Sequence, residues 1–385
     1  MFNKIEEAIS FIENQRVKRS FADFKDILIR YNIRTDLKNV IHVAGTNGKG
    51  STVIFMKDLL LKKGYRVGTF TSPYIIKHNE RIAVDGKMIS DDDLLRLINQ
   101  VYPIIEKEKL SMFEIDTLIM LVYFNELSLD YHIIECGIGG LYDKTNVVNA
   151  KYALITNIGY DHQFMLGDEL KEIASHKVGI VKEGSALFTT EENQEILAYF
   201  KDYCTKLGSK LEVVKVSKQS NYPYCLEYNN DIYCLSLPAY QINNLALALN
   251  TIGSFIDFSR DEIEEVIDNF YWPCRFEYIN GYYLDGAHNI DGIKALVKTV
   301  KERELEDVGI IFSALGDKNI KEMLELLSDF DVCIAGFEDD RSVKADYTYQ
   351  EAIELMGNKH QNVVVTGSLH FVSTVRKYLL KSDTR

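Results

Sequence analysis

Short apolar runs alternate with longer stretches of helical periodicity along the first half of the chain. Short runs bounded by polar residues are typical of buried strands, and apolar residues three or four apart are typical of amphipathic helices. The predicted strands cover residues 39–43, 65–70, 131–135 and 152–158. The predicted helices cover residues 53–63, 94–105, 113–127 and 168–182. Strands separated by helices predict an α/β fold with a mainly parallel sheet.

The same alternation returns toward the carboxyl end of the chain. Strands predicted at residues 282–284, 308–313, 332–335 and 363–366 alternate with helices predicted at 290–301, 320–327, near 349–356 and from 368. Before them, Trp272-Pro273 ends a helix predicted to begin near Asp261, because proline cannot continue a helix. We predict two domains, residues 1–272 and a smaller one of residues 273–385, with a β-ribbon near residues 224–237.

Two shorter patterns lie between the first predicted strands. Residues 79–82 and 84–89 suit two short strands around a turn at Asp85-Gly86. Three acidic residues at 91–93 follow Ser90, and we interpret them as partners of a helix N-terminus rather than as a metal site.

Composition and charge narrow the class of protein. The chain has 385 residues, of which 46% are hydrophobic and 26% charged, which is ordinary for a globular protein. A net charge of −13 argues against a nucleic-acid binder, which needs a basic face. The first residues lack the pattern of a secretory signal, and the longest apolar stretch, residues 118–124, is too short for a membrane span. We expect a cytoplasmic protein that binds neither nucleic acid nor membrane.

Six cysteines show neither a CxxC pair nor the spacing of zinc ligands. They stand at positions 136, 204, 225, 234, 274 and 333. Because a chain of this size needs no disulfides for stability, we expect reduced and mostly buried thiols.

A glycine-rich loop joins the first predicted strand to the helix after it. Glycines allow the backbone N–H groups to curl inward, the helix start adds positive dipole, and a lysine and a serine supply an ammonium and a hydroxyl. Such a loop suits nucleotide phosphates, with the hydroxyl on Mg²⁺. The alternative is a strand-to-helix turn without a ligand. The residues concerned are Gly45, Thr46, Asn47, Gly48, Lys49, Gly50, Ser51 and Thr52.

The order Gly-Thr-Asn-Gly-Lys-Gly-Ser resembles the loop of the Mur ligase superfamily. Glycine at position 50, directly after the lysine, is similar to the folylpolyglutamate and dihydrofolate synthase branch, whereas the cell-wall ligases usually carry threonine there. The resemblance implies a P-loop nucleotide-binding domain with a mainly parallel sheet, followed by a smaller Rossmann-like α/β domain.

Two further segments resemble parts of that family that lie near the pterin substrate. The family's Thr-Ser-Pro-His corresponds to Thr71, Ser72, Pro73 and Tyr74, and a similar Asn-Glu-Arg-Ile segment follows it. The family's Gly-Gly-Arg-Leu-Asp-Ala-Thr-Asn-Val-Val keeps its aspartate here as Asp143, but Leu141 replaces arginine and Lys144 replaces alanine. Because the aspartate and alanine help hold dihydropteroate in bifunctional members, a chain that only extends folates fits better. For residues 71–74, a simple proline turn is the alternative.

Three predicted metal ligands are Ser51, Glu135 and His162. Glu135 ends a buried strand, where open α/β sheets bind ligands, although a lone carboxylate there can also be a cap or an ion-pair partner. The segment from Asp161 to Gly167 resembles the family's Asp-His-x-x-x-Leu-Gly, whose histidine binds a second Mg²⁺. Lys177 matches a family lysine that can be carbamylated and help hold metal, and an unmodified lysine facing solvent is the alternative.

The remaining nucleotide contacts are implied by motifs in the last third of the chain. Asn244 matches a family contact to the nucleotide base, and Arg275, in Trp-Pro-Cys-Arg, matches an arginine that reaches ATP. Asp285 and His288 match the family's Asp-x-Ala-His-Asn, whose aspartate and histidine face the nucleotide. A further Asp-Lys signature ends at Lys318.

Together these matches imply an ATP-dependent amide ligase that adds L-glutamate to the γ-carboxyl of a folate, with dihydropteroate as a second substrate left open. In the family, the γ-phosphoryl group of ATP moves to the carboxylate, and the amine of glutamate attacks the acyl phosphate. The implied catalytic residues are Lys49, Glu135, His162 and Lys177. ATP and Mg²⁺ are the implied cofactors, and a requirement for K⁺ is left open. The implied binding partners are ATP, folate and L-glutamate. The protein is expected to be a monomer. The alternatives are a small-molecule kinase, a nucleotide-gated binding protein without turnover, and a cell-wall precursor ligase, which Gly50 disfavours.

Overall fold

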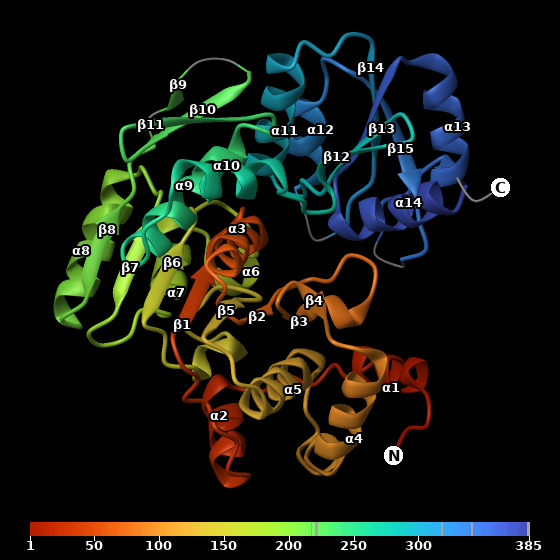
Figure 1. The fold of residues 1–385 in the computed structure, drawn as a ribbon. Coiled ribbons are helices and arrows are strands. Elements are labelled where there is room, and N and C mark those ends of the chain that lie inside the picture. The colour runs from red at the N-terminus through yellow and green to blue at the C-terminus, as the bar shows by residue number, and fades with distance from the viewer. Residues whose placement is uncertain (217, 220–221, 317–318, 340–341, 383–385) are drawn as a thin grey trace. The chain divides into compact units, whose positions relative to one another are not determined.

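A computed structural model describes residues 1–216, 218–219, 222–316, 319–339 and 342–382. The chain forms two compact units (Figure 1). The first contains Met1–Val216 and Asn243–Phe270, and the second contains Ser217–Ile242 and Tyr271–Arg385. Residues 217–242 therefore belong to the second compact unit. The division into domains of residues 1–272 and 273–385 stays a prediction.

The first unit is built on one mixed sheet within residues 1–216. Its strands run in the order β4-β3-β2-β5-β1-β6-β7-β8. The pairs from β2 to β8 are parallel, whereas β3 pairs antiparallel with both β2 and β4. The strands are β1 (Val40–Ala44), β2 (Val67–Phe70), β3 (Ile82–Val84), β4 (Lys87–Met88), β5 (Tyr131–Glu135), β6 (Tyr152–Ile155), β7 (Ala186–Thr189) and β8 (Lys210–Val213).

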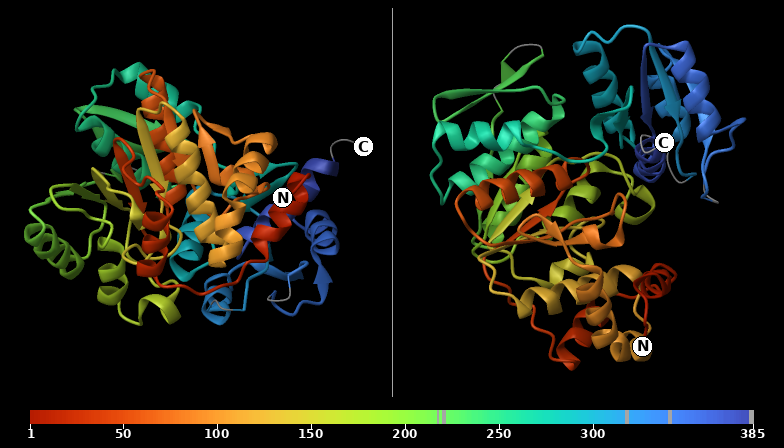
Figure 2. Two further views of the ribbon diagram at one scale, coloured as in Figure 1. Left: turned by 90° about the horizontal axis from the view of Figure 1, so that it is seen from below. Right: turned by 45° about the vertical axis from the view of Figure 1, so that its right-hand side comes forward.

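The helices of the first unit cover this sheet and build a second core beside it. Helices α1, α4 and α5 lie side by side (Figures 1 and 2) and share a large apolar cluster with α2. The helices are α1 (Ile5–Glu13), α2 (Phe21–Arg30), α3 (Lys49–Lys62), α4 (Asp91–Glu108), α5 (Met112–Glu126), α6 (Gln163–Leu166), α7 (Leu170–Val178), α8 (Gln194–Lys206) and α10 (Arg260–Asp268), with 3-10 turns η1 (His78–Arg81) and η2 (Lys144–Val147). The residues of α9 (Tyr240–Gly253) divide between the two units.

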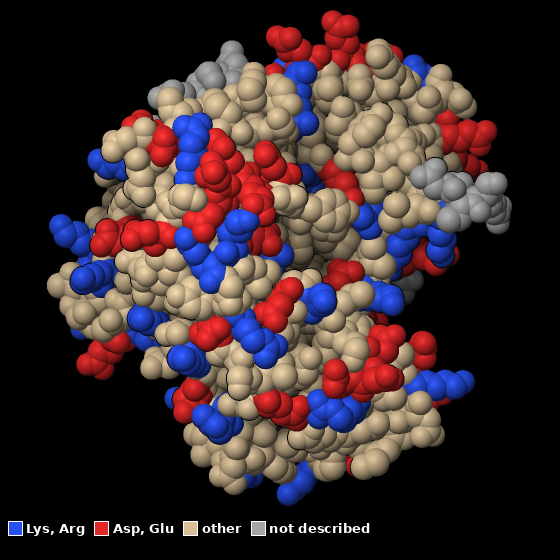
Figure 3. All heavy atoms as spheres, viewed as in Figure 1, with Lys and Arg blue, Asp and Glu red and all other residues tan. Residues whose placement is uncertain are grey.

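Helix α3 is held on several sides, which fixes the helix start that follows the glycine loop. Its residues from Ser51 to Met56 are all buried, and it contacts β1, β2 and β5 as well as α10. Phe55 stacks on Phe270 with ring centroids 3.9 Å apart. At its far end two lysines form ion pairs with glutamates of α10, a region that Figure 3 shows as acidic side chains with basic ones beside them.

The second unit contains a six-stranded sheet and a separate three-stranded ribbon within its described residues. The sheet order is β12-β13-β17-β14-β15-β16, parallel except for β12 against β13, and the ribbon order is β11-β10-β9. The strands are β9 (Lys218–Gln219), β10 (Tyr224–Tyr228), β11 (Asp231–Leu235), β12 (Arg275–Ile279), β13 (Tyr282–Asp285), β14 (Val308–Phe312), β15 (Asp331–Gly336), β16 (Tyr347–Thr348) and β17 (Asn362–Thr366). The helices are α11 (Ile290–Glu302), α12 (Ile320–Leu326), α13 (Tyr349–Lys359) and α14 (Leu369–Ser382).

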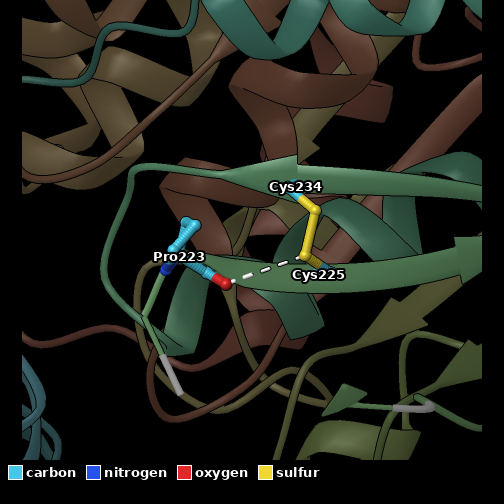
Figure 4. The surroundings of a disulfide bond; sticks show 3 residues. All are labelled: Pro223, Cys225 and Cys234. Atoms are coloured by element: carbon cyan, nitrogen blue, oxygen red, sulfur yellow. Dashed lines mark hydrogen bonds between the residues drawn. A yellow bond between two sulfur atoms is a disulfide. The ribbon is translucent and has the colours of Figure 1, made fainter. Parts of the chain in front are cut away.

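One disulfide corrects the expectation that all six thiols are reduced. Cys225 on β10 lies directly opposite Cys234 on β11, and their sulfur atoms are bonded (Figure 4). The expectation was wrong because it considered sequence spacing alone, whereas the antiparallel register brings the two Cα atoms to 4.0 Å. The other four cysteines are free and buried, as expected.

Most predicted elements are confirmed, with one local correction. Residues 82–84 and 87–88 form the expected hairpin, and Ser90 caps α4 ahead of its three acidic residues. Residues 79–81, which we expected to belong to the first of these strands, instead lie in the 3-10 turn η1 (His78–Arg81). Lys318 and the aspartate before it lie outside the described residues. Within the described residues, no helix combines the length and apolar character needed to cross a membrane.

Candidate functional site

The glycine loop connects the carboxyl end of β1 to the first turn of α3, as the sequence predicted. Gly45 has φ of +149° and Gly48 has φ of +85°, a conformation that residues with side chains rarely adopt. A Cβ atom at Gly45 would lie 1.8 Å from Oγ1 of Thr156, and one at Gly48 would lie 2.2 Å from Oδ1 of Asn244. The loop therefore needs glycine at both positions. Asn244, the predicted base contact, is buried against this loop.

The segment after β6 supports the loop from beside it. The Thr46 N–H donates to the Asn157 carbonyl at 3.0 Å, and the Asn47 N–H donates to Oδ1 of Asn157 at 3.0 Å. In return, the Thr156 hydroxyl donates to the Asn47 carbonyl at 2.6 Å, and the Thr46 hydroxyl donates to the Gly159 carbonyl at 3.1 Å. Sequence reasoning did not single out Thr156 or Asn157, although their position after a strand adjacent to β1 was a usable signal.

Two lysine side chains reach the loop from different helices. Lys49, at the start of α3, donates through Nζ to the carbonyls of Gly45 at 3.1 Å and Thr46 at 3.3 Å. Lys177, near the end of α7, donates to the same Gly45 carbonyl at 2.9 Å. Burial lowers the pKa of Lys177 to about 7, and the charge of Lys49 acts in the same direction. The alternative that Lys177 faces solvent is wrong, because its exposed fraction is 3%.

Glu135 lies where parallel strands end beside the loop. It ends β5, pairs in register with Val43 of β1, and is buried. Its carboxylate accepts a hydrogen bond from the Ser72 N–H at 3.1 Å, which joins the predicted metal ligand to the predicted substrate segment. In that segment, the Thr71 N–H donates to the Arg81 carbonyl at 2.9 Å, and the bond between Ser72 and Pro73 is cis.

The predicted metal ligands lie in the first turn of α3, at the end of β5 and at the start of α6, and their contact with a cation stays a prediction. Ser51 lies buried in the first turn of α3, and His162 stands at the start of α6 with φ of +51°. The N–H of His162 donates to Oδ1 of Asp161 at 2.9 Å. Among the described residues, no three His, Cys, Asp or Glu side chains gather as metal ligands.

The carboxylate of Asp143 is engaged in its own loop. It accepts from the Ile138 N–H at 2.9 Å, from the Thr145 N–H at 3.0 Å and from the Thr145 hydroxyl, and it caps η2. Burial raises the pKa of Asp143, and these hydrogen bonds oppose the rise. The structure therefore gives Asp143 a loop-closing role, and its contact with substrate stays a prediction.

The neighbouring Lys144 is tied to elements near the amino terminus. Its Nζ lies 3.0 Å from Oε1 of Glu114, which is fully buried, and it donates to the carbonyls of Arg19 at 2.8 Å and Ser20 at 2.9 Å. This lysine, which replaces the family's alanine, thus has three partners within the protein.

Tyr74 belongs to a buried network that sequence reasoning missed. Its hydroxyl donates to Oε1 of Glu13 at 2.5 Å, and the same oxygen lies 3.2 Å from Nδ1 of His78. The other ring nitrogen of His78 lies 2.8 Å from Oδ1 of Asp116, whose second oxygen lies 3.4 Å from Nε of Arg81. These residues come from α1, α5, η1 and the segment before η1, so only the three-dimensional fold brings them together.

In the second unit, Asp285 and His288 lie in one loop between β13 and α11. Asp285 is buried; its Oδ1 accepts from the Ala287 N–H at 2.9 Å, and its Oδ2 accepts from the Tyr240 hydroxyl at 2.8 Å. His288 approaches the Gly286 carbonyl through Nδ1 at 2.9 Å. Arg275 begins β12, and its guanidinium donates to the Cys274 carbonyl at 3.1 Å.

Two family models match the chain over most of its length. The Mur ligase middle domain matches residues 43–255, and the Mur ligase glutamate ligase domain matches residues 274–380. The chain is 32% identical to the dihydrofolate synthase/folylpolyglutamate synthase of Bacillus subtilis, over 98% of this chain and 100% of that protein.

Solved structures agree with this relationship. The chain is similar to a bifunctional folylpolyglutamate synthase/dihydrofolate synthase with Mn, AMPPNP and L-glutamate bound, with a TM-score of 0.86 and 26% identity over 98% of both chains. It is also similar to E. coli FolC in complex with DHPP and ADP, with a TM-score of 0.87 and 25% identity over 100% of this chain and 99% of that one. The glycine loop, the supporting strands and these matches together show that the chain belongs to the folylpolyglutamate synthase/dihydrofolate synthase family of Mur ligases.

Proposed function

We propose that this protein is an ATP-dependent ligase that adds L-glutamate to the γ-carboxyl of a folate. The observation that carries the proposal is the position of three side chains, Lys49, Lys177 and Glu135, beside the glycine loop. Glu135 also accepts a hydrogen bond from Ser72 of the predicted substrate segment. The names of the related proteins support the same activity, and one relative was solved with an ATP analogue and glutamate together.

The reaction requires an activated carboxyl group, because a carboxylate ion resists attack by an amine. In the proposed route, a carboxylate oxygen of the folate attacks the γ-phosphorus of ATP and ADP leaves. The amine of glutamate then attacks the resulting acyl phosphate, and phosphate leaves as the amide forms. The loop N–H groups and Lys49 hold the phosphates in line for the first step.

The other predicted residues take supporting roles in this proposal. Magnesium held by Ser51, Glu135 and His162 would supply positive charge that offsets the charge of the transferring phosphoryl group. Asn244, Arg275, Asp285 and His288 would hold the nucleotide; residues 71–74 and Asp143 would contact the folate.

A substrate panel with purified protein, ATP and Mg²⁺ tests the function. We expect ADP release and a new amide product, detected by mass spectrometry, only when tetrahydrofolate and glutamate are both present. ADP release that needs the folate but not glutamate would instead indicate a small-molecule kinase. ATP binding without ADP release in any combination would indicate a nucleotide-gated binding protein.

Dihydropteroate belongs in the same panel, because Lys144 replaces the family's alanine. We propose that the chain extends folates and does not use dihydropteroate; amide product from dihydropteroate at a comparable rate would contradict this narrower proposal. The variant Lys144→Ala tests whether this residue sets the difference. The cytoplasmic location, the monomeric state and a requirement for K⁺ stay predictions.

A further inference from the structure

The hydroxyl of Tyr240 makes a hydrogen bond that the proposed reaction does not yet use. Tyr240 begins α9, and its hydroxyl donates to Oδ2 of Asp285 at 2.8 Å. Both residues belong to the second unit, although 45 positions separate them in sequence. Desolvation and the Asp285 carboxylate raise the pKa of Tyr240 well above its usual value. The phenol therefore stays protonated and remains a donor at neutral pH.

The Asp285 carboxylate is buried, so protein groups supply its hydrogen bonds. Its carboxylate is buried, with Oδ1 held by the Ala287 N–H and Oδ2 held by the Tyr240 hydroxyl. Burial raises the pKa of Asp285, and the charge of Arg275 and the bond from Tyr240 oppose the rise. The Phe276 N–H is a further donor to this carboxylate, so donors from several elements together fix the plane of the group.

The guanidinium of Arg275 packs against the same loop. A Cβ atom placed on Gly286 would lie 2.4 Å from the Nη1 atom of Arg275, so only glycine leaves room for the guanidinium there. Tyr240, Asp285, Gly286 and Arg275 are therefore contiguous.

We propose that Tyr240 is a positioning residue that orients the Asp285 carboxylate for nucleotide binding. The inference rests on the proposed function, in which Asp285 faces the nucleotide. Removing the hydroxyl leaves one carboxylate oxygen of Asp285 without this buried donor, so the group turns or takes up a proton. The nucleotide then meets a misplaced Asp285, while folate and glutamate binding are unaffected.

The test compares Tyr240→Phe with Tyr224→Phe. Tyr224 is a matched control in the same unit, because its hydroxyl donates to a carboxylate oxygen of Glu302 at 2.5 Å, away from the Asp285 loop. We expect Tyr240→Phe to weaken binding of the ATP analogue AMPPNP about tenfold, the usual consequence of losing a hydrogen bond to a charged group. We expect Tyr224→Phe to leave this affinity unchanged, and KM for folate and glutamate to stay unchanged in both variants.

Two further variants separate positioning from structural support. Tyr240→His restores a ring N–H donor and should recover most of the affinity. In protein that already carries Asp285→Asn, adding Tyr240→Phe should not weaken AMPPNP binding further, because Tyr240 acts through the Asp285 carboxylate. Equal AMPPNP affinity in Tyr240→Phe and the unaltered protein, or additive losses in the double variant, would overturn the inference. Because AMPPNP binding is measured without folate or glutamate, failure of the proposed ligase reaction would be recognised separately.

Discussion

The buried pair of His78 and Asp116 predicts a pH-dependent stability that can be worked out from its contacts. His78 is 5% exposed and lies between Asp116 of α5 and Glu13 of α1, with Arg81 and Tyr74 facing the same group. Burial by itself lowers the pKa of His78, but the two carboxylates outweigh burial and Arg81, and the pKa is raised to about 9. The histidine is therefore a buried cation at neutral pH.

The size and sign of the effect follow from proton linkage. Each tenfold change in proton affinity is worth ~1.4 kcal/mol. A pKa raised from 6.5 in the unfolded chain to about 9 in the fold therefore corresponds to about 3 kcal/mol. Because the folded pKa is the higher one, this stabilisation is fully present below about pH 6.5 and is lost as the pH rises through about 9.

The assay is urea unfolding of the unaltered protein and of His78→Gln at several pH values from about 6 to about 10. The difference in unfolding free energy between the two should shrink by about 3 kcal/mol across this range. The difference between the two proteins is measured because other groups also change stability with pH. Lys177 and Lys182 have lowered pKa values, so their contributions to stability rise with pH, whereas that of His78 falls. His132→Gln is the matched control: burial lowers the pKa of His132 below its usual 6.5, so its contribution to stability rises with pH near 6.5 and is constant at higher pH, opposite in sign to that of His78.

Nuclear magnetic resonance gives a direct check on the same group. The ring signals of His78, assigned by their loss in His78→Gln, should titrate near pH 9 and should move toward lower pH in Asp116→Asn. The reasoning is refuted if His78 titrates at or below 6.5, or if the stability difference between the two proteins is constant from about pH 6 to about pH 10.

Three further experiments test the glycine loop, the buried Lys177 and the ion pair between Arg376 and Glu277. Gly45→Ala should destabilise the protein by about 1–3 kcal/mol and abolish ATP binding, because its Cβ would lie 1.8 Å from Thr156; native thermal stability with normal binding would contradict this. Lys177 should react with ¹³C-bicarbonate to give a carbamate signal that grows above about pH 7, where its amine is neutral, and Lys177→Met should lack that signal. Arg376→Met should cost about 3 kcal/mol in urea unfolding, because it leaves the Glu277 carboxylate buried without its ion pair, and adding Glu277→Leu should recover most of the loss.

The sequence predicted the elements with strong periodicity, and its continuous motifs supplied the candidate site residues, whose roles stay predictions. Strand β5 matches its predicted bounds, and the glycine loop follows β1 as expected. What escaped prediction depends on register or on distant pairing. Cys225 meets Cys234 only through the alignment of two strands, and His78 meets Asp116 only once α5 has packed beside η1. Neither relation leaves a periodic signal in the chain.

The residues that support the glycine loop have a consequence for how tightly a ligand can bind. Thr156 and Asn157 fix the backbone of Asn47 before any ligand arrives, so little conformational freedom remains to be lost on binding. We therefore expect affinity for phosphate to depend in part on the side chains that hold the loop backbone in place. Shortening Thr156 to alanine would let the backbone sample other conformations, and the loss would be seen in the entropy of binding rather than in the number of contacts.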